Sequence, residues 1–190
     1  MNRVVPFLLV ASAIAYFVQV ANPELLSAFM FVPHLALARP WSFVSYMFLH
    51  GSLVHFGFNM LGLWFFGSAV ESVIGARRFA FLYFLSGVSG ALCSMLLSMK
   101  VAVIGASAGV LGVMLAYARF WPEKPILEWG VARVRTPVLV LIAIIMAILG
   151  SFDGSASDTA SLAHLGGLVG AWFYLRGRIR WNHCSNGLSE

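Results

Sequence analysis

The chain has 190 residues, of which 61% are hydrophobic and only 10% are charged, and its mean hydropathy is +0.89. Soluble domains are about 45–50% apolar and about 25% charged, so this composition excludes an ordinary soluble domain and indicates a membrane protein. The net charge of +5 is spread over the ends of apolar segments, which excludes a basic groove for nucleic acid. The two cysteines, Cys93 and Cys184, lie far apart in the sequence and exclude a disulfide framework or a zinc cluster.

Six apolar segments are long enough to cross a membrane as helices, which takes about 17–25 residues. In chain order they are Val4–Ala21, Phe43–Val70, Phe79–Met99, Ile104–Phe120, Thr136–Phe152 and Ala160–Leu175. Continuous apolar runs disfavour a membrane β-barrel, whose strands alternate in polarity. We therefore expect an all-α, polytopic bundle of six transmembrane helices, formed by one domain over residues 1–180 with a short cytoplasmic tail over residues 181–190.

The first segment follows Arg3, but no convincing small-residue cleavage site comes after it. We therefore interpret it as a retained span and not as a signal peptide. With the N-terminus inside, all basic residues except Arg39 and Lys100 fall on the cytoplasmic side. These inner residues are Arg3, Arg77, Arg78, Arg119, Lys124, Arg133, Arg135, Arg176, Arg178 and Arg180. The positive-inside rule then predicts that both termini are cytoplasmic.

The second segment carries three polar residues. His55 and Asn59 are four residues apart and share one face of a helix, whereas His50 lies about 140° round the helix from His55. We expect His50 at an irregular start of this span, where it can hydrogen-bond loop backbone. Gly51 and Ser52 fit a capped helix start there. Ionisable groups within hydrocarbon are costly and are usually functional.

The fourth and sixth segments each carry one further candidate. Ser107 lies in Gly105-Ala106-Ser107-Ala108-Gly109, about four residues into its segment, and His164 lies about four residues into the sixth. Both segments run inward from the outer face in this topology, so each side chain is expected roughly 6 Å below the start of its helix. A serine and a histidine at equal depth suggest a nucleophile and its base, if the helices pack closely enough for a hydrogen bond.

Small residues line both of these segments, and such faces let helices approach closely in lipid. They are Gly105, Ala108, Gly109 and Gly112 in the fourth segment, and Ala163, Gly166, Gly167, Gly170 and Ala171 in the sixth.

Simpler interpretations exist for each feature. A serine in a span is commonly a packing residue whose hydroxyl bonds to a carbonyl of its own helix, and most of the glycines serve packing alone. Two histidines with an asparagine could form a metal site, but His50 and His55 lack the i, i+3 or i, i+4 spacing of helical metal ligands. Gly-Ala-Ser-Ala-Gly also matches the elbow of soluble α/β-hydrolases, which requires a strand before the serine, whereas both flanks here are span sequence.

Taken together, these residues resemble the rhomboid family of intramembrane serine proteases. The matching motifs are His50-x4-His55-x3-Asn59, Gly105-Ala106-Ser107 and Ala163-His164-x2-Gly167-x2-Gly170. Their order, their segments and their sidedness agree with the family from roughly Pro40 to Arg176. Glu71 with Gly75, after the second span, is similar to the family's cytoplasmic turn.

The resemblance implies a role for each matching residue. Ser107 would be the nucleophile and His164 the general base and acid, a dyad without an aspartate. The oxyanion hole would consist of the Ser107 backbone N–H and the side chains of His55 and Asn59. His50 would be structural, together with Gly105 and Gly167, and neither a metal nor another cofactor is expected. The first external loop would be partly embedded in the membrane, and the fifth span with the loop after it would act as the substrate gate.

Two departures from the family pattern are visible. Many bacterial members have Trp-Arg in the first loop where this chain has Trp41-Ser42, which affects the expected anchoring of that loop. The residue after the nucleophile is often glycine, and here it is Ala108.

The expected function is an intramembrane serine endopeptidase that cleaves single-span membrane proteins near the outer face. Its partners would be these substrates and membrane lipids, with no nucleic acid, and its location a bacterial inner membrane as a multi-pass protein. The alternative is a non-catalytic rhomboid-like chaperone or adaptor that binds transmembrane segments. A small transporter or channel is a third class, for which charges in the middle of the spans are expected.

Overall fold

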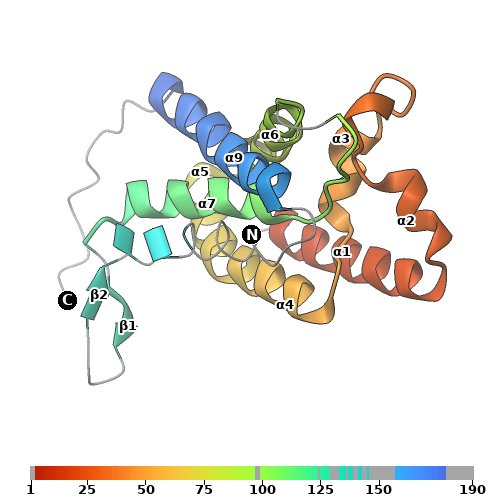
Figure 1. Cartoon of the computed structure of the whole chain (residues 1–190). Helices are drawn as coiled ribbons and strands as arrows, with labels where there is room; N and C mark the ends of the chain where they lie inside the picture. The colour runs from red at the N-terminus through yellow and green to blue at the C-terminus, as the bar shows by residue number, and fades with distance from the viewer. Residues whose placement is uncertain are drawn as a thin grey trace.

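The computed structural model describes residues 3–96, 99–123, 125–128, 133–135, 137–138, 141–142, 145 and 157–178. Most of this structure is helical (Figure 1). The described α-helices are α1 (Val4–Ala21), α2 (Glu24–Phe29), α3 (Ser42–Ser45), α4 (Leu53–Gly62), α5 (Ser68–Ile74), α6 (Ala76–Ser94), α7 (Ser107–Phe120) and α9 (Ser157–Arg178). Short turns of other helix types are η1 (Pro33–Leu35), η2 (Tyr46–Phe48) and the π-helical turn η3 (Leu63–Gly67), which joins α4 to α5.

Helices α6, α7 and α9 pack against one another and form the centre of the bundle. Small residues allow this contact, as the sequence predicts, because a side chain at several glycines would strike a neighbouring helix. These positions and the residues that they face are Gly112 against Ser86 and Ala171, Gly166 against Ser89 and Cys93, and Gly170 against Ser89. The packing that brings α7 and α9 together is therefore specified by residue size.

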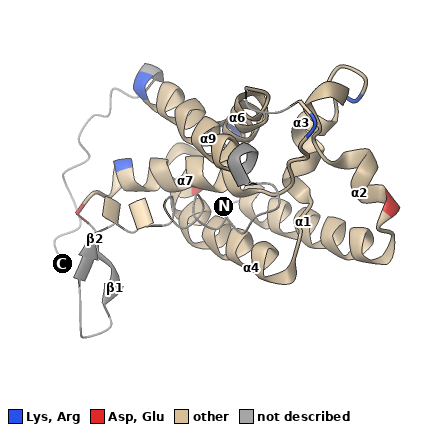
Figure 2. Ribbon diagram, in the orientation of Figure 1, with Lys and Arg blue, Asp and Glu red and all other residues tan. Residues whose placement is uncertain are grey.

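Two helical stretches of the described chain are long and apolar enough to cross a membrane. They are α1 and the continuous helix Leu53–Ile74, while α7 is apolar but shorter. Charged residues lie at helix ends and in loops (Figure 2). The prediction of an all-helical bundle is confirmed for the body of the molecule. The number of crossings and their sidedness stay predictions, and the fifth predicted span, Thr136–Phe152, lies almost wholly outside the described residues.

Strands β1 (Pro125–Glu128) and β2 (Arg133–Arg135) form a small antiparallel hairpin after α7, which the sequence analysis did not predict. The two strands pair Leu127 with Val134 and Glu128 with Arg133. Strands of three and four residues are too short to give a recognisable period-two pattern, which explains why they were missed. The hairpin is an addition to the helical bundle and contains none of the candidate site residues.

Glu71, in the middle of α5, caps the N-terminus of α1. Its side chain is only 1% exposed. Its carboxylate accepts hydrogen bonds from the backbone N–H groups of Arg3 at 2.8 Å, Val4 at 2.9 Å and Val5 at 3.0 Å. The first N–H groups of a helix have no partner within the helix, and the helix dipole favours a negative charge beside them. This contact therefore joins the two ends of a 66- to 68-residue stretch of chain.

We expect Glu71→Ala to lower the free energy of unfolding by about 2–4 kcal/mol, because three backbone donors lose a charged acceptor. Thermal unfolding of the purified protein in detergent measures this change. Glu24→Ala removes an exposed carboxylate from the first turn of α2 and is the matched control. Equal unfolding temperatures for the two variants would contradict the assigned capping role.

Candidate active site

Ser107 and His164 form a direct hydrogen bond across the interface between α7 and α9. Oγ of Ser107 and Nε2 of His164 are 2.6 Å apart, although the residues are separated by 57 positions in the chain. Both residues are half-buried. This distance lies within the range of about 2.6–3.2 Å that a nucleophile and its base require. The structure thus brings together the serine and the histidine that the sequence singles out.

Ser107 is the first residue of α7. The backbone two residues earlier, at Gly105, is not helical. Gly105 has φ +119°, in the region that favours glycine, and its N–H donates to the carbonyl of Tyr46 at 2.9 Å. The expected position of Ser107 one turn inside its helix is therefore wrong, as is that of His164, which lies seven residues after the start of α9 at Ser157. As the first helical residue, Ser107 has a backbone N–H that the helix itself does not use.

Gly167 explains how α9 comes this close to the start of α7. A Cβ at residue 167 would lie 2.9 Å from Cα of Ala108 and closer still to its carbonyl group. Such distances are not tolerated between a side chain and backbone, so a larger residue would push the two helices apart. Both glycines that the sequence marks as structural, Gly105 and Gly167, thus lie directly beside the serine.

The imidazole of His55 lies against Gly105, next to the serine. A Cβ at residue 105 would be 2.7 Å from Cε1 and 2.9 Å from Nε2 of the His55 ring. His55 belongs to the first turn of α4, where Ser52 caps the helix by accepting the His55 backbone N–H at 3.1 Å. The predicted capped helix start at Gly51 and Ser52 is therefore confirmed.

Asn59 lies one turn further along α4 and is 6% exposed. Its Nδ2 donates to the backbone carbonyl of His55 at 2.9 Å. A primary amide has two N–H donors. The bond to His55 engages one N–H of Asn59, and the other N–H is the second donor of the amide. The bond also fixes the side chain against its own helix on the face that carries His55.

His50 is fully buried, and two hydrogen bonds to its backbone groups hold it in place. Gln19 of α1 donates to the His50 carbonyl at 2.5 Å and accepts the His50 N–H at 3.0 Å. The ring lies edge-on to the rings of His55 and Phe56, with centroids 5.2 and 5.3 Å away. The ring nitrogens meet no partner at strict hydrogen-bond geometry within the described residues, but the backbone of Phe48 interacts with the ring.

Gln19 is a residue that the sequence analysis missed. It is a polar side chain inside an otherwise apolar span, which is the signal that could have identified it. Its amide offers both a donor and an acceptor, and the structure uses both on one residue of the neighbouring loop.

The first loop, between α1 and α4, is fastened by its own side chains. Arg39 donates to the carbonyl of Ser27 at 2.6 Å, the indole of Trp41 to that of Ala28 at 3.0 Å, and Ser45 to that of Phe29 at 2.7 Å. Ser42 is buried and donates to the carbonyl of Arg39 at 2.6 Å. The side chain of Arg39, two positions before Trp41, thus binds one backbone carbonyl of the loop.

The same loop is hydrogen-bonded to the segment that leads to Ser107. Phe31 and Val103 exchange two backbone hydrogen bonds, of 3.1 and 2.8 Å, as in a short antiparallel pair. Both the backbone N–H and the ring Nδ1 of His34 lie 2.9 Å from the carbonyl oxygen of Met99. These bonds fix the position of the segment that precedes Ser107 relative to the first loop.

Among the described residues, no three His, Cys, Asp or Glu side chains gather in a way that could hold a metal ion. The polar groups that lie on and beside α7 and α9 here are the Ser107 hydroxyl, the His164 and His55 imidazoles and, on α4, the Asn59 amide. These are the groups of acyl-transfer chemistry, in which a base activates a hydroxyl and N–H donors stabilise an oxyanion.

Comparison with known proteins identifies the family. The sequence model of the Rhomboid domain matches residues 37–180. Rhomboid protease GluP of Bacillus subtilis is 33% identical over 156 residues, which are 80% of this chain and 29% of that protein. RHOMBOID-like protein 4 of Arabidopsis thaliana is 30% identical over 158 residues, 77% of this chain and 37% of that one.

Rhomboid protease GlpG of Serratia proteamaculans is 30% identical over 129 residues, 68% of this chain and 45% of the relative. The chain thus spans less than half the length of each of these three relatives. The Rhomboid match includes all the candidate site residues and covers most of the chain. The chain therefore belongs to the rhomboid family, whose members are integral membrane proteins and mostly serine proteases.

Proposed function

We propose that this chain is an intramembrane serine endopeptidase that uses Ser107 and His164 to cleave transmembrane segments of single-span membrane proteins. The observation that supports this proposal most is the 2.6 Å contact between Ser107 Oγ and His164 Nε2. A serine that only packs within a helix commonly donates its hydroxyl to a carbonyl of the same helix, as Ser86 does to Leu82 at 2.8 Å. Ser107 instead meets the one side chain type that accepts a proton near neutral pH.

In the proposed mechanism, Nε2 of a neutral His164 takes the proton from Ser107 as Oγ attacks the carbonyl carbon of the scissile peptide. The resulting imidazolium then gives this proton to the nitrogen of the leaving amine, and an acyl-enzyme ester forms on Ser107. A water molecule, deprotonated by His164, attacks the ester carbon. The histidine returns the proton to Oγ as the ester breaks, and the enzyme is regenerated.

The tetrahedral intermediate carries a negative oxygen that needs donors. We assign this role to the backbone N–H of Ser107, the His55 ring and the second N–H of Asn59. The first lies at the positive end of the α7 dipole, and the His55 ring lies beside Gly105. Donors of this kind commonly contribute about 2.7–4 kcal/mol each to the stabilisation of the transition state.

The proposal includes a topology of six crossings with both termini in the cytoplasm, in one domain over residues 1–180 followed by a tail over residues 181–190. The distribution of lysines and arginines supports this orientation. The site would then face the outer side of the membrane, where water is available for hydrolysis. A bacterial inner membrane remains our prediction for its location, and the relatives include bacterial, plant and worm proteins.

The substrate must expose a peptide bond whose carbonyl is normally bonded within a helix. Substrate spans that contain glycine or proline near the outer surface are therefore favoured, because these residues lower the cost of local unwinding. The non-catalytic alternative, a membrane chaperone or adaptor, would bind such spans without any chemical change to them. Cleavage of a reporter separates the two functions.

We expect Ser107→Ala and His164→Ala each to lower the cleavage rate by at least about a thousandfold, because the nucleophile or its base is lost. The measurement uses a single-span reporter in liposomes, together with labelling of Ser107 by a fluorophosphonate. Ser72→Ala, which removes an exposed serine whose hydroxyl bonds to its own helix, is the matched control. Undiminished cleavage by Ser107→Ala protein would refute the assignment of the nucleophile.

Asn59→Ala should lower kcat about a hundredfold, less than loss of the serine, because it removes one donor to the oxyanion. Single-turnover cleavage of the same reporter measures this step. The control is Asn22→Ala, which removes a side-chain amide that bonds to the carbonyl four residues earlier at the end of α1. A kcat that is unchanged by Asn59→Ala would exclude the amide from the oxyanion hole.

Gln19→Leu should lower kcat several-fold while Ser107 still reacts with the fluorophosphonate. The substitution removes both bonds to His50 and loosens the start of α4, which carries His55, at a cost of about 1–3 kcal/mol. Thermal unfolding and the separate values of kcat and KM are measured, with Val20→Ala at a neighbouring exposed residue as the control. If kcat stays at the wild-type value while stability falls, Gln19 serves only the fold.

A further inference from the structure

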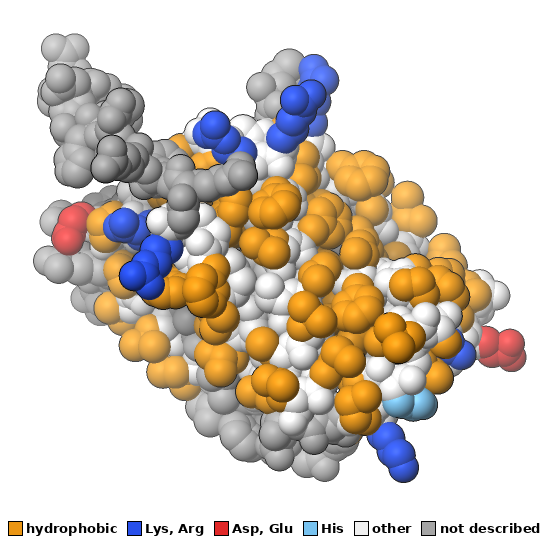
Figure 3. All heavy atoms as spheres, turned by 90° about the horizontal axis from the view of Figure 1, so that it is seen from above, with side chains coloured by type: hydrophobic (Ala, Val, Ile, Leu, Met, Phe, Trp, Pro, Cys, Tyr) orange, Lys and Arg blue, Asp and Glu red, His pale blue; other side chains and the backbone are white. Residues whose placement is uncertain are grey.

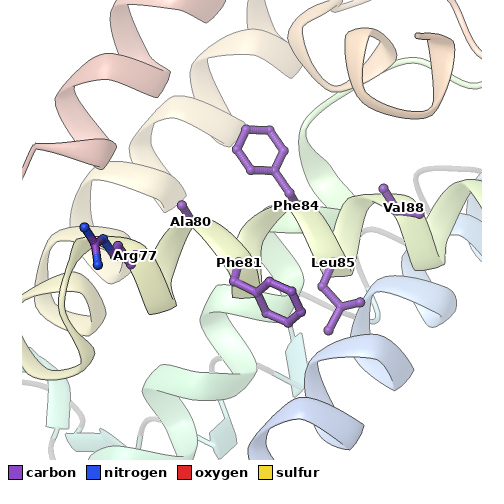
Figure 4. Close-up of a pocket in the computed structure, with 6 residues that line it drawn as sticks. All are labelled: Arg77, Ala80, Phe81, Phe84, Leu85 and Val88. Atoms are coloured by element: carbon purple, nitrogen blue, oxygen red, sulfur yellow. The ribbon is translucent and has the colours of Figure 1, made fainter. Parts of the chain in front are cut away.

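A shallow groove runs along one face of α6 and includes none of the candidate site residues (Figure 4). Its volume is about 470 Å³, within the range of about 300–1,000 Å³ that is usual for small-molecule sites. The lining residues recur at intervals of three and four, so they form one stripe of a single helix. They are Arg77, Ala80, Phe81, Phe84, Leu85 and Val88.

The groove is apolar along its length and positive at one end. Figure 4 shows Phe84 reaching to one side of the helix and Phe81 and Leu85 to the other, with Arg77 at the end of the row. The distance along the helix from Arg77 to Val88 is about 16 Å at 1.5 Å per residue. This length matches one leaflet of a hydrocarbon core that is about 30 Å thick.

Further contacts indicate that the Arg77 end lies at the surface of the membrane. The rings of Phe81 and Tyr174 are 5.2 Å apart, which places the last turns of α9 beside the first turns of α6. On α9 the guanidinium of Arg176 lies 4.9 Å from the centre of the Trp172 ring. Tryptophan and arginine together are typical of the membrane–water interface.

The positive charge at this end is not cancelled by the nearby carboxylate. Glu71 is buried, and both of its oxygens accept backbone N–H groups of α1. Arg77 and Arg78 are both exposed. Figure 3 shows the corresponding pattern on one face of the molecule, where hydrophobic side chains fill the middle and lysines and arginines lie towards its margins.

We propose that this groove binds one phospholipid with an anionic head group. The phosphate and its negative head group are held by Arg77, and one acyl chain lies along Ala80, Phe81, Leu85 and Val88. A transmembrane helix is a poorer fit, because helices pack on faces of small residues, whereas Phe81, Phe84, Leu85 and Val88 are large. The site goes beyond the proposed proteolysis and does not depend on it, since it requires only that the protein is embedded in a membrane.

The experiment reconstitutes the full chain with equal amounts of phosphatidylglycerol and phosphatidylcholine that have identical acyl chains. Native mass spectrometry of the released protein then measures the lipid that stays bound. We expect one phosphatidylglycerol to be retained in about fivefold preference, the factor that one basic residue near a membrane surface gives. Arg77→Gln should abolish this preference, and Arg77→Lys should keep it. Arg119→Gln, an exposed arginine at the end of α7, is the matched control and should keep it.

A second pair of variants tests the apolar part of the groove without altering charge. Ala80→Trp fills the groove and should reduce the retention of both lipids, whereas Leu92→Trp, at an exposed position of α6 outside the groove, should not. Equal effects of Arg77→Gln and Arg119→Gln would overturn the proposal, since the preference would then reflect overall charge. The proposal would also be overturned if the wild-type protein formed a dimer that Ala80→Trp dissociated. The groove would then be covered by a second copy of the chain and not by a lipid.

Discussion

The close approach of α7 and α9 is the constraint on which the site depends. The short serine side chain reaches the imidazole at 2.6 Å because the two helices pack closely here. Gly167 against the backbone of Ala108 permits this. In lipid no hydrophobic effect presses helices together, so the fit of small residues supplies the association. Small residues at the centre of the bundle therefore also set the distance between Ser107 and His164.

Polar side chains elsewhere in the bundle act on backbone groups that secondary structure leaves unpaired. Glu71 accepts the first N–H groups of α1, and Gln19 pairs with both backbone groups of His50. In an apolar environment each unpaired backbone group costs several kcal/mol. A buried side chain that pairs such groups therefore stabilises the fold more than an exposed ion pair does. Each of these contacts also joins two distant parts of the chain, which fixes where α1 lies relative to α4 and α5.

Much of this arrangement could be predicted from the sequence, because composition, residue size and rare polar residues in apolar segments are strong signals. The helical bundle, the closeness of Ser107 to His164 and the capping role of Ser52 follow from such signals. The start of α7 does not, because the positive φ of Gly105 depends on its bond to Tyr46 in a distant loop. The partner of Gln19 and the short strands β1 and β2 were not predictable either, since each depends on contacts that no local pattern encodes.

Hydrogen bonds join the first loop to the segment that precedes Ser107. The side chains of Arg39, Trp41 and Ser45 each donate a hydrogen bond to a backbone carbonyl within the loop. These bonds hold the parts of the loop together. Phe31 of this loop pairs with Val103, which lies in the segment just before Ser107. A displacement of this loop would therefore be transmitted through the Phe31–Val103 pair to the segment that precedes Ser107.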